Sequence, residues 1–250
     1  MAGHSKWAQI KHKKEKVDKE KGKIFNKLIR EITVAARLGG GEIDFNPRLR
    51  LAVERAKSYN MPWENIERAI KKGTGELEGV KYEEVIYEGY GPGGVAIIVE
   101  ATTDNKNRTT NEIRHIFSKY GGNLGTTGCV SWQFKDKGIL RVPKESINEE
   151  ELFDITIEAG AEDIKTEGDS YEITCNPENF YNLKKILTER GLQVEGDIMK
   201  IPNLTVKIEG KKAEALLKLL QTLEEHDDVQ RTYSNFEIEE KEFEALTKTI

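Results

Sequence analysis

The chain has only two cysteines and no long hydrophobic run. Cys129 and Cys175 lie far apart without His or Cys neighbours, which excludes a disulfide framework and favours a reducing compartment. The apolar run over residues 95–99 is short, whereas a membrane span needs roughly 20 residues. No apolar stretch follows the N-terminal charges, so we expect no secretory signal. The low cysteine content, the short apolar runs and the expected lack of a secretory signal together predict a soluble cytoplasmic protein.

Charge is unevenly distributed along the chain. Residues 1–75 contain 18 Lys and Arg against 9 Asp and Glu, a net charge of +9. Residues 76–250 contain 21 against 35, a net charge of −14, and the overall net charge of −5 hides this asymmetry. A basic segment on an acidic body indicates a polyanionic partner for the first part alone. A phosphate backbone is the commonest such partner.

The basic first part has the periodicity of a small helical domain. Apolar residues recur every three or four positions from Gly22 onward, again after Asn46-Pro47, and again after Pro62. This spacing is typical of helices with one buried face. Asn46 suits an N-cap and Pro47 the first helical position. We expect the stretch before Gly22 to be a further helix or an arm that orders on binding.

The rest of the chain predicts an α+β region. Glycines indicate a linker over residues 71–80, and from about Tyr82 the apolar period changes to that of strands. Residues 138–201 carry the order β-α-β-β-α-β, which is typical of a ferredoxin-like domain. The segments on either side repeat this order when joined. They are the predicted strands 95–101, 130–134, 204–208 and 229–236 and the predicted helices 107–120 and 211–225.

The predicted fold class is therefore α+β and multidomain, with one ferredoxin-like βαββαβ domain inserted into another. Exposed loops tolerate such insertions. Thr109 and Glu112 have the spacing of a capping box near the start of the helix 107–120. The expected domains are a basic helical domain over residues 1–75, a discontinuous ferredoxin-like domain over 80–136 and 202–250, and an inserted one over 137–201.

Lysines and arginines of the first part are the candidate nucleic-acid contacts. Trp7 lies among them and could stack on a base. Alternatively, the stretch is a solvated helix in which Glu15, Asp18 and Glu20 pair with neighbouring lysines, but its net charge favours nucleic acid. The candidates are Lys6, Trp7, Lys11, Lys13, Lys14, Lys16, Lys19, Lys21, Lys23, Lys27, Arg30, Arg37, Arg48, Arg50, Arg55, Arg68, Lys71 and Lys72.

A glycine-rich stretch over residues 121–128 is a second candidate contact. Gly125, Thr126, Thr127 and Gly128 could present backbone N–H groups and hydroxyls to phosphate oxygens. The stretch lacks a Walker lysine and precedes a predicted strand, so it is not a nucleotide-hydrolysing loop. Alternatively, it is a helix C-cap followed by a turn.

The sequence offers no catalytic or metal-binding constellation. Its four histidines are scattered, and it contains no C-x-x-C motif, so we expect no metal and no cofactor. No nucleophile has a base at a recognisable spacing. We expect a non-enzymatic protein without a small-molecule substrate.

Several longer motifs stand out along the chain, namely Ala2-Gly3-His4-Ser5-Lys6-Trp7, Ile10-Lys11-His12-Lys13-Lys14, residues 44–57, Met61-Pro62, residues 66–70, Lys71-Lys72-Gly73, residues 87–94 and residues 121–125. Together these motifs resemble the YebC/PmpR family. Cys129 departs from the family pattern, in which a serine is expected after Gly-Thr-Thr-Gly. The resemblance implies a cytoplasmic, non-enzymatic regulator with a helical N-terminal domain and two α/β domains.

The resemblance leaves two functions open. Family members are described as probable transcriptional regulators that bind DNA, whereas mitochondrial and some bacterial relatives resemble translation activators that act on ribosomes. In the first case the helical domain binds duplex DNA and the acidic α/β body positions a protein partner. In the second, the same basic surface holds ribosomal RNA and residues 121–128 reach a functional centre. A protein scaffold with an incidental basic arm is a third alternative, and no membrane partner is expected.

Overall fold

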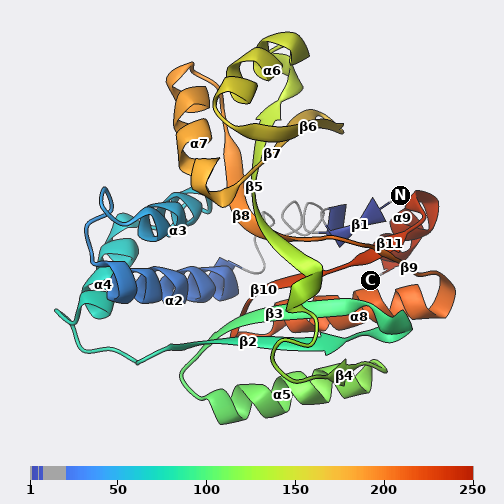
Figure 1. Cartoon of the computed structure of the whole chain (residues 1–250). Helices are drawn as coiled ribbons and strands as arrows, with labels where there is room; N and C mark the ends of the chain where they lie inside the picture. Colours follow the sequence, from blue (N-terminus) through green and yellow to red (C-terminus); the bar gives the residue numbers. More distant parts are fainter. Residues whose placement is uncertain (1, 5, 8–20, 250) are drawn as a thin grey trace. The chain divides into compact units, whose positions relative to one another are not determined.

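The computed structural model describes residues 2–4, 6–7 and 21–249. The chain divides into two compact units, of which unit 1 comprises Met1–Gln133 and Leu204–Ile250 and unit 2 comprises Phe134–Asn203. Unit 1 contains a group of helices, a larger antiparallel sheet and a small mixed sheet. Unit 2 contains an antiparallel sheet with two helices (Figure 1). The predicted α+β class, with a helical N-terminal region, is confirmed. The three finer domain boundaries stay predictions.

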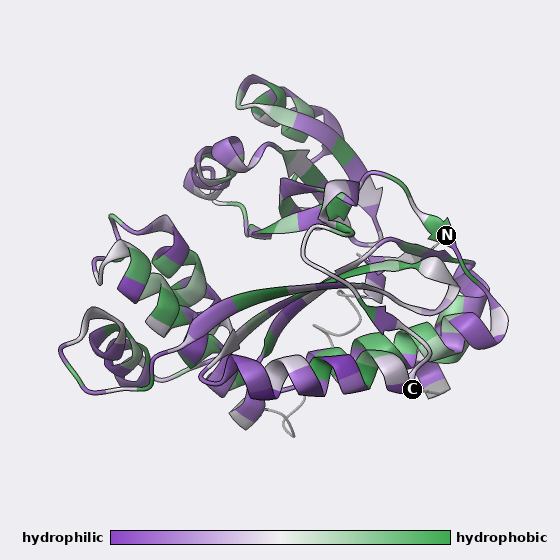
Figure 2. Ribbon diagram, turned by 60° about the horizontal axis from the view of Figure 1, so that its bottom comes forward, coloured by the Kyte–Doolittle hydropathy of each residue, from purple (hydrophilic) through white to green (hydrophobic). Residues whose placement is uncertain are grey.

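Three helices in unit 1 bury one shared core. They are α2 (Lys21–Gly39), α3 (Pro47–Ser58) and α4 (Trp63–Thr74). Their inward faces supply Ile32, Leu49 and Ile66, each fully buried. The Asn46 side chain caps α3 by accepting a 3.0 Å hydrogen bond from the Leu49 N–H, as the sequence predicts. Figure 2 shows hydrophilic and hydrophobic residues alternating along the helices.

The larger sheet of unit 1 has the strand order β10-β3-β2-β4, with every pair antiparallel. Apolar side chains of β3, α5 and α8 form its core, in which Ile97, Phe117 and Leu220 are fully buried. Pro92–Gly94 forms a short turn between β2 and β3. The elements are β2 (Glu83–Tyr90), β3 (Ala96–Thr103), α5 (Lys106–Lys119), β4 (Asn123–Leu124), α8 (Gly210–Glu225) and β10 (Val229–Ser234).

A small second sheet of unit 1 joins the two ends of the chain. β1 (Ala2–Gly3) pairs antiparallel with β11 (Phe236–Ile238), and β11 pairs parallel with β9 (Val206–Lys207). Helix α9 (Glu240–Thr249) follows and buries Phe243. Ala2 and Gly3 are therefore part of a sheet of unit 1.

Unit 2 has the predicted ferredoxin-like order. Its strands are arranged β6-β7-β5-β8, all antiparallel, and its core includes Leu140, Phe180 and Leu187. This prediction is confirmed. The elements are β5 (Phe134–Pro143), α6 (Glu149–Glu158), β6 (Ala161–Glu167), β7 (Ser170–Cys175), α7 (Phe180–Glu189) and β8 (Glu195–Pro202), with short turns at Lys144–Ser146 and Pro177–Asn179.

Two strand predictions in the discontinuous α/β part are wrong. Residues 130–134 do not form a strand, because Ser131–Gln133 is a 3-10 turn and β5 begins at Phe134. The buried Glu88 carboxylate accepts the Val130 and Ser131 N–H groups, which a strand would give to its neighbour. The predicted strand 204–208 is shorter in the structure, where only β9 is a strand, and it belongs to the small sheet and not to the larger one. The larger sheet contains β2 instead.

The capping-box prediction is also wrong. Asn105 is the N-cap of α5, and its side chain accepts from the Arg108 N–H. Thr109 is buried and donates to Asp228 instead. Among the described residues, no helix combines the length and hydropathy that crossing a bilayer requires.

Candidate nucleic-acid interface

Two of the predicted basic contacts hold α2 against the α/β part of unit 1. Lys27 Nζ donates to the Glu224 carbonyl oxygen. Arg30 Nη1 contacts the Asp228 carboxylate and the main-chain oxygens of Thr102 and Asp227, at 2.5, 3.2 and 3.0 Å. The Arg30 side chain is only 18% exposed. These two cations therefore have an intramolecular role in the structure.

Asp228 is the centre of this junction. Its side chain is 2% exposed and accepts hydrogen bonds from Arg108 at 2.7 Å, Thr109 at 2.6 Å and Thr103 at 3.1 Å, besides Arg30. Burial alone would raise the pKa of Asp228, but the hydrogen bonds from Thr109, Arg108 and Arg30 outweigh it and hold the pKa well below its usual range. The carboxylate is therefore charged at neutral pH and links α2, α5 and β3.

Carboxylates also neutralise several other predicted contacts. Arg55 lies 3.7 Å from Glu31, a carboxylate that Arg231 contacts at 3.2 Å as well. Burial tends to raise the pKa of Glu31, but these two arginines and Arg48 bring it below its usual value. The remaining pairs are Arg48 with Glu84, Lys71 with Glu67 at 2.8 Å, and Lys6 with Glu240.

Five predicted cations have no carboxylate partner within the described part of the chain. Arg37 and Arg50 donate to backbone carbonyls, of Tyr82 and of Ile43 and Asp44 respectively, which leaves their positive charge uncompensated. Arg68 and Lys72 lie one turn apart on the exposed face of α4. Their spacing gives α4 a positive outer surface. The five are Lys23, Arg37, Arg50, Arg68 and Lys72.

Trp7 is not free to stack on a base. It is 7% exposed and belongs to the core between the larger sheet and α9, where it meets Phe243 edge to face at 6.5 Å. Its Nε1 donates to both carboxylate oxygens of Glu224 at 3.2 Å. The stacking hypothesis for Trp7 is therefore corrected, because the ring already has apolar partners and its polar edge is paired.

Several predicted contacts cannot be placed. Lys11, Lys13, Lys14, Lys16 and Lys19 belong to residues 8–20, which lie outside the described residues, and the side chain of Lys21 is likewise not described. The described residues on either side of this stretch are fixed to unit 1, through Trp7 before it and Lys27 after it.

Sequence reasoning missed the exposed aromatics of the helical part. Phe45 is 86% exposed and Trp63 is 49% exposed, and Lys57 Nζ lies 5.2 Å from the centre of the Trp63 ring. The available signal was position: Phe45 precedes the N-cap Asn46, and Trp63 is the first residue of α4. Neither place faces the core. Exposed aromatics beside cations are typical of single-strand or base-stacking surfaces.

The Glu88 carboxylate binds the backbone at the end of the glycine-rich loop. The Glu88 carboxylate, 3% exposed, accepts from the N–H groups of Gly128, Val130 and Ser131 at 2.7, 2.8 and 2.8 Å. Burial acts to raise the pKa of Glu88, but the bonds from Val130, Gly128 and Ser131 lower it overall. The four candidate contacts of this loop are exposed, namely Gly125, Thr126, Thr127 and Gly128.

One group of side chains has the composition of a metal site. Among the described residues, Glu112, His226 and Asp228 bring potential ligand atoms within 4.8 Å of one another. His226 Nε2 contacts Glu112 at 2.9 Å, and Nδ1 accepts from the Asp228 N–H. Arg30 and Arg108 already bind the Asp228 carboxylate. Two adjacent guanidinium charges make this group unsuitable for a cation.

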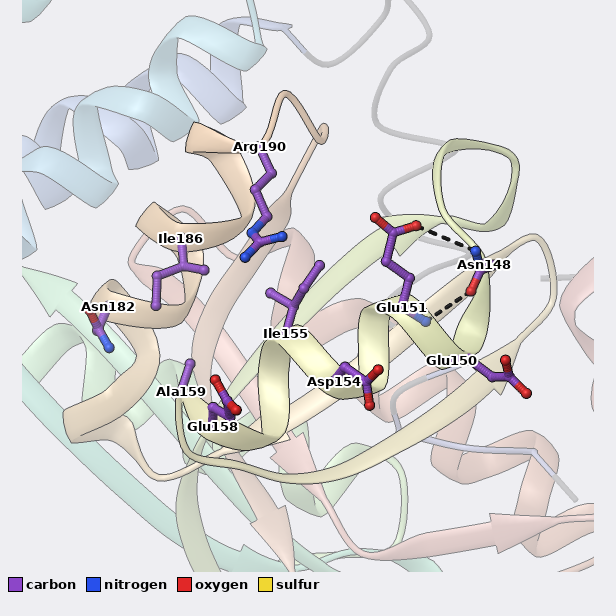
Figure 3. A pocket seen from close by; sticks show the side chains of 10 residues that line it. All are labelled: Asn148, Glu150, Glu151, Asp154, Ile155, Glu158, Ala159, Asn182, Ile186 and Arg190. Carbon is purple, nitrogen blue, oxygen red and sulfur yellow. Dashed lines mark hydrogen bonds between the residues drawn. The ribbon is translucent and has the colours of Figure 1, made fainter.

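A hollow in unit 2 has the opposite character to the helical part. It lies between α6 and α7 and has a volume of about 880 Å³ (Figure 3). Glu150, Glu151, Asp154 and Glu158 line it together with Arg190. Such an acidic lining repels phosphate, so this hollow does not extend the candidate interface.

Two family comparisons cover almost the whole chain. The family model described as "TACO1/YebC protein N-terminal domain" matches residues 5–76, and the one described as "TACO1/YebC second and third domain" matches residues 82–236. The chain belongs to the TACO1/YebC family. The family resemblance recognised in the sequence motifs is thereby confirmed.

Members of the TACO1/YebC family from several bacteria are similar over their full length. A "Probable transcriptional regulatory protein" from Sulfurihydrogenibium sp. is 59% identical over 98% of this chain and 99% of its own length. A protein of the same description from Thermotoga maritima is 58% identical over 100% of this chain and 99% of its own. The crystal structure of a "Conserved Hypothetical Protein" from Aquifex aeolicus is 56% identical and superposes with a TM-score of 0.81, covering 89% of this chain and 93% of that one.

Proposed function

We propose that this chain is a non-enzymatic regulator of transcription that binds duplex DNA through its basic first part. The observation that carries the proposal is the charge asymmetry, with a net charge of +9 over residues 1–75 and −14 over the rest. Counterion release makes such a surface bind a phosphate backbone, and it makes an acidic surface avoid one. The relatives from Sulfurihydrogenibium sp. and Thermotoga maritima are described as probable transcriptional regulatory proteins, which agrees with this role.

We restrict the proposed contacts to the cations that have no intramolecular carboxylate partner in the described part of the chain. Lys27 and Arg30 are engaged within unit 1, and Arg48, Arg55 and Lys71 have carboxylate partners. The proposed surface therefore consists of residues 8–23, the outer face of α4 with Arg68 and Lys72, and the cations with only backbone partners. Trp63 supplies an exposed ring beside it. A surface of this kind contacts the phosphate backbone and positions the protein without reading sequence by itself.

A ribosome-associated translation activator is the alternative that uses the same basic surface. The observation that favours it is the exposed loop with Gly125, Thr126, Thr127 and Gly128, which Glu88 holds in place. A rigid loop carrying N–H groups and hydroxyls could contact RNA as well as DNA. In either case the acidic α/β part is free to meet a protein partner, and the proposed location is the cytoplasm.

Competition between DNA and ribosomes tests the proposal. Full-length protein is mixed with labelled promoter-length duplex DNA, and purified ribosomes are added at physiological salt. We expect a footprint on particular DNA sequences that ribosomes do not remove. Cosedimentation with ribosomes, without selective DNA binding, would favour the translation alternative. Binding to neither would overturn both and leave a protein scaffold.

A further inference from the structure

Trp63 exposes a large apolar ring on the helical part of unit 1. It is the first residue of α4 and is 49% exposed, whereas Ile66 and Ala69 of the same helix are buried in the core. An indole left half in water contributes less to folding than a buried one. The ring therefore has apolar surface that a ligand can cover.

The segment that carries this ring is basic. Residues 46–75 contain 7 Lys and Arg against 3 Asp and Glu, a net charge of +4. Lys57, in the last turn of α3, places its Nζ 5.2 Å from the centre of the Trp63 ring. Within the described part of the chain, this ammonium has no carboxylate partner. A cation is bound only weakly over an exposed ring, so a flat group that stacks more closely can displace it.

Phe45 has the exposure of Trp63 but not its charged neighbour. It is 86% exposed and follows Asp44, an exposed acidic residue. Among the residues that the structure describes, no cation lies over the Phe45 ring. Surfaces that bind single-stranded nucleic acid combine an aromatic ring for the base with a cation for the phosphate. Trp63 has both parts of this combination, and Phe45 has only the ring.

We propose that Trp63 stacks on an unpaired base, and that the nucleic acid recognised by the helical part is a duplex interrupted by a single-stranded segment. The indole covers the face of the base, and the Lys57 ammonium moves from the ring to a phosphate of the same strand. In an uninterrupted duplex the neighbouring base pairs cover both faces of each base, so the ring finds no partner. This inference rests on the proposed function, because it assigns α4 and its surroundings to the nucleic-acid interface.

Two DNA ligands test the preference, a fully paired duplex of about 24 base pairs and the same duplex with about four unpaired bases at its centre. Anisotropy of the labelled DNA gives the affinity of the full-length protein for each. We expect wild type to bind the interrupted duplex about tenfold more tightly, because one stacked base contributes at least this much. Trp63→Ala should bring the ratio of the two affinities close to one, and Trp63→Phe, which keeps a ring, should retain most of it. Phe45→Ala is the matched control and should leave the ratio unchanged.

The fluorescent base 2-aminopurine, placed among the unpaired bases, reports stacking directly, because its fluorescence falls when an aromatic ring covers it. At saturating protein we expect quenching by wild type and by Phe45→Ala, and little quenching by Trp63→Ala. Thermal unfolding checks that each variant is folded, so that a loss of structure is not mistaken for a loss of stacking.

The outcomes separate the two proposals. If wild type binds both duplexes equally, or if Phe45→Ala loses as much preference as Trp63→Ala, the role of Trp63 is overturned while the proposed function stands. A preference that survives in Trp63→Ala overturns this role as well, since another group then recognises the unpaired base. Wild-type binding to the paired duplex without salt dependence overturns the proposed function instead, and the quenching of 2-aminopurine then still decides whether Trp63 stacks on a base.

Discussion

At the residue scale, buried carboxylates organise this chain. Asp228, Glu88 and Glu224 are each less than a tenth exposed, and each accepts hydrogen bonds from segments distant in sequence. A buried charge is tolerated only when such donors surround it. Removing one of these carboxylates therefore leaves several buried donors without an acceptor, and each unpaired buried donor lowers the stability of the fold.

Asp228→Asn should destabilise the protein. The substitution removes the charge that Arg30 and Arg108 share, and breaking a buried pair in this way costs about 3 kcal/mol. Urea unfolding at pH 7 measures the loss. The control is Asp227→Asn, an exposed neighbour for which we expect a change below about 0.5 kcal/mol. Equal losses in the two variants would contradict the role assigned to Asp228.

The stabilisation from Asp228 should also depend on pH. Because its pKa is lower in the folded protein than its usual value, its contribution is complete above the unfolded-state pKa of about 4. It is lost as the pH falls through the folded-state pKa. The difference in unfolding free energy between wild type and Asp228→Asn should be constant from neutral pH to about 5 and should shrink below about 4. A difference that grows on acidification would exclude this linkage.

The roles of residues whose partners are close in sequence could be predicted, whereas the roles of residues with distant partners could not. Asn46 caps α3 as predicted, because its acceptor meets an N–H three residues away. Trp7 was predicted to be a base-stacking residue, but its partner Glu224 is 217 positions along the chain. The charge count shows that the first part of the chain is basic, yet it could not show that Arg48 and Arg55 face Glu84 and Glu31.

At the scale of elements, α2 and α4 approach closely at Gly73. A Cβ added there would lie 2.4 Å from the Thr33 carbonyl oxygen and 2.8 Å from the Ala36 Cβ. Gly22, in contrast, has open space around it within α2. The two helices therefore depend on one glycine for their packing.

Gly73→Ala and Gly22→Ala should have opposite effects on stability. Overpacking at Gly73 should cost about 2 kcal/mol, whereas Gly22→Ala should add about 0.5 kcal/mol through better helix propensity. Thermal unfolding of both variants checks the signs. Stabilisation by Gly73→Ala would mean that α2 and α4 pack less closely than described.

The exposed face of α4 should contribute to nucleic-acid binding. Arg68→Gln and Lys72→Gln should each reduce the slope of log affinity against log salt by about 1, and should weaken binding evenly across DNA sequences. Lys211→Gln, on the α/β part, is the matched control and should leave the slope unchanged. Fluorescence anisotropy over a salt series measures all three. An unchanged slope in the α4 variants would remove this face from the interface.

Elements with strong periodicity and clear turns were predictable. The order of unit 2 followed from its alternating strands, its two short helices and the hairpin glycine Gly168. The strand prediction for residues 130–134 was wrong, although these residues do alternate between apolar and polar. The Glu88 carboxylate accepts the N–H groups that strand pairing would need. Such competition by a buried side chain is invisible in a hydrophobic pattern.

At the scale of the whole molecule, the chain combines a basic first part with an acidic remainder. The structure changes how this arrangement should be tested. Deleting residues 1–23 would remove β1 and the buried Trp7 as well as the lysines, and would damage the α/β core. Substituting lysines within residues 8–20 by glutamine removes positive charge and keeps both β1 and Trp7 in the chain.

The salt dependence of DNA binding by the full-length protein is the most direct test. If the basic first part contacts about six phosphates, the slope of log affinity against log salt should be near −5, and replacing Lys11, Lys13 and Lys14 by glutamine should bring it to about −3. A slope near zero for the unmodified protein, or an identical slope after the three replacements, would contradict the account.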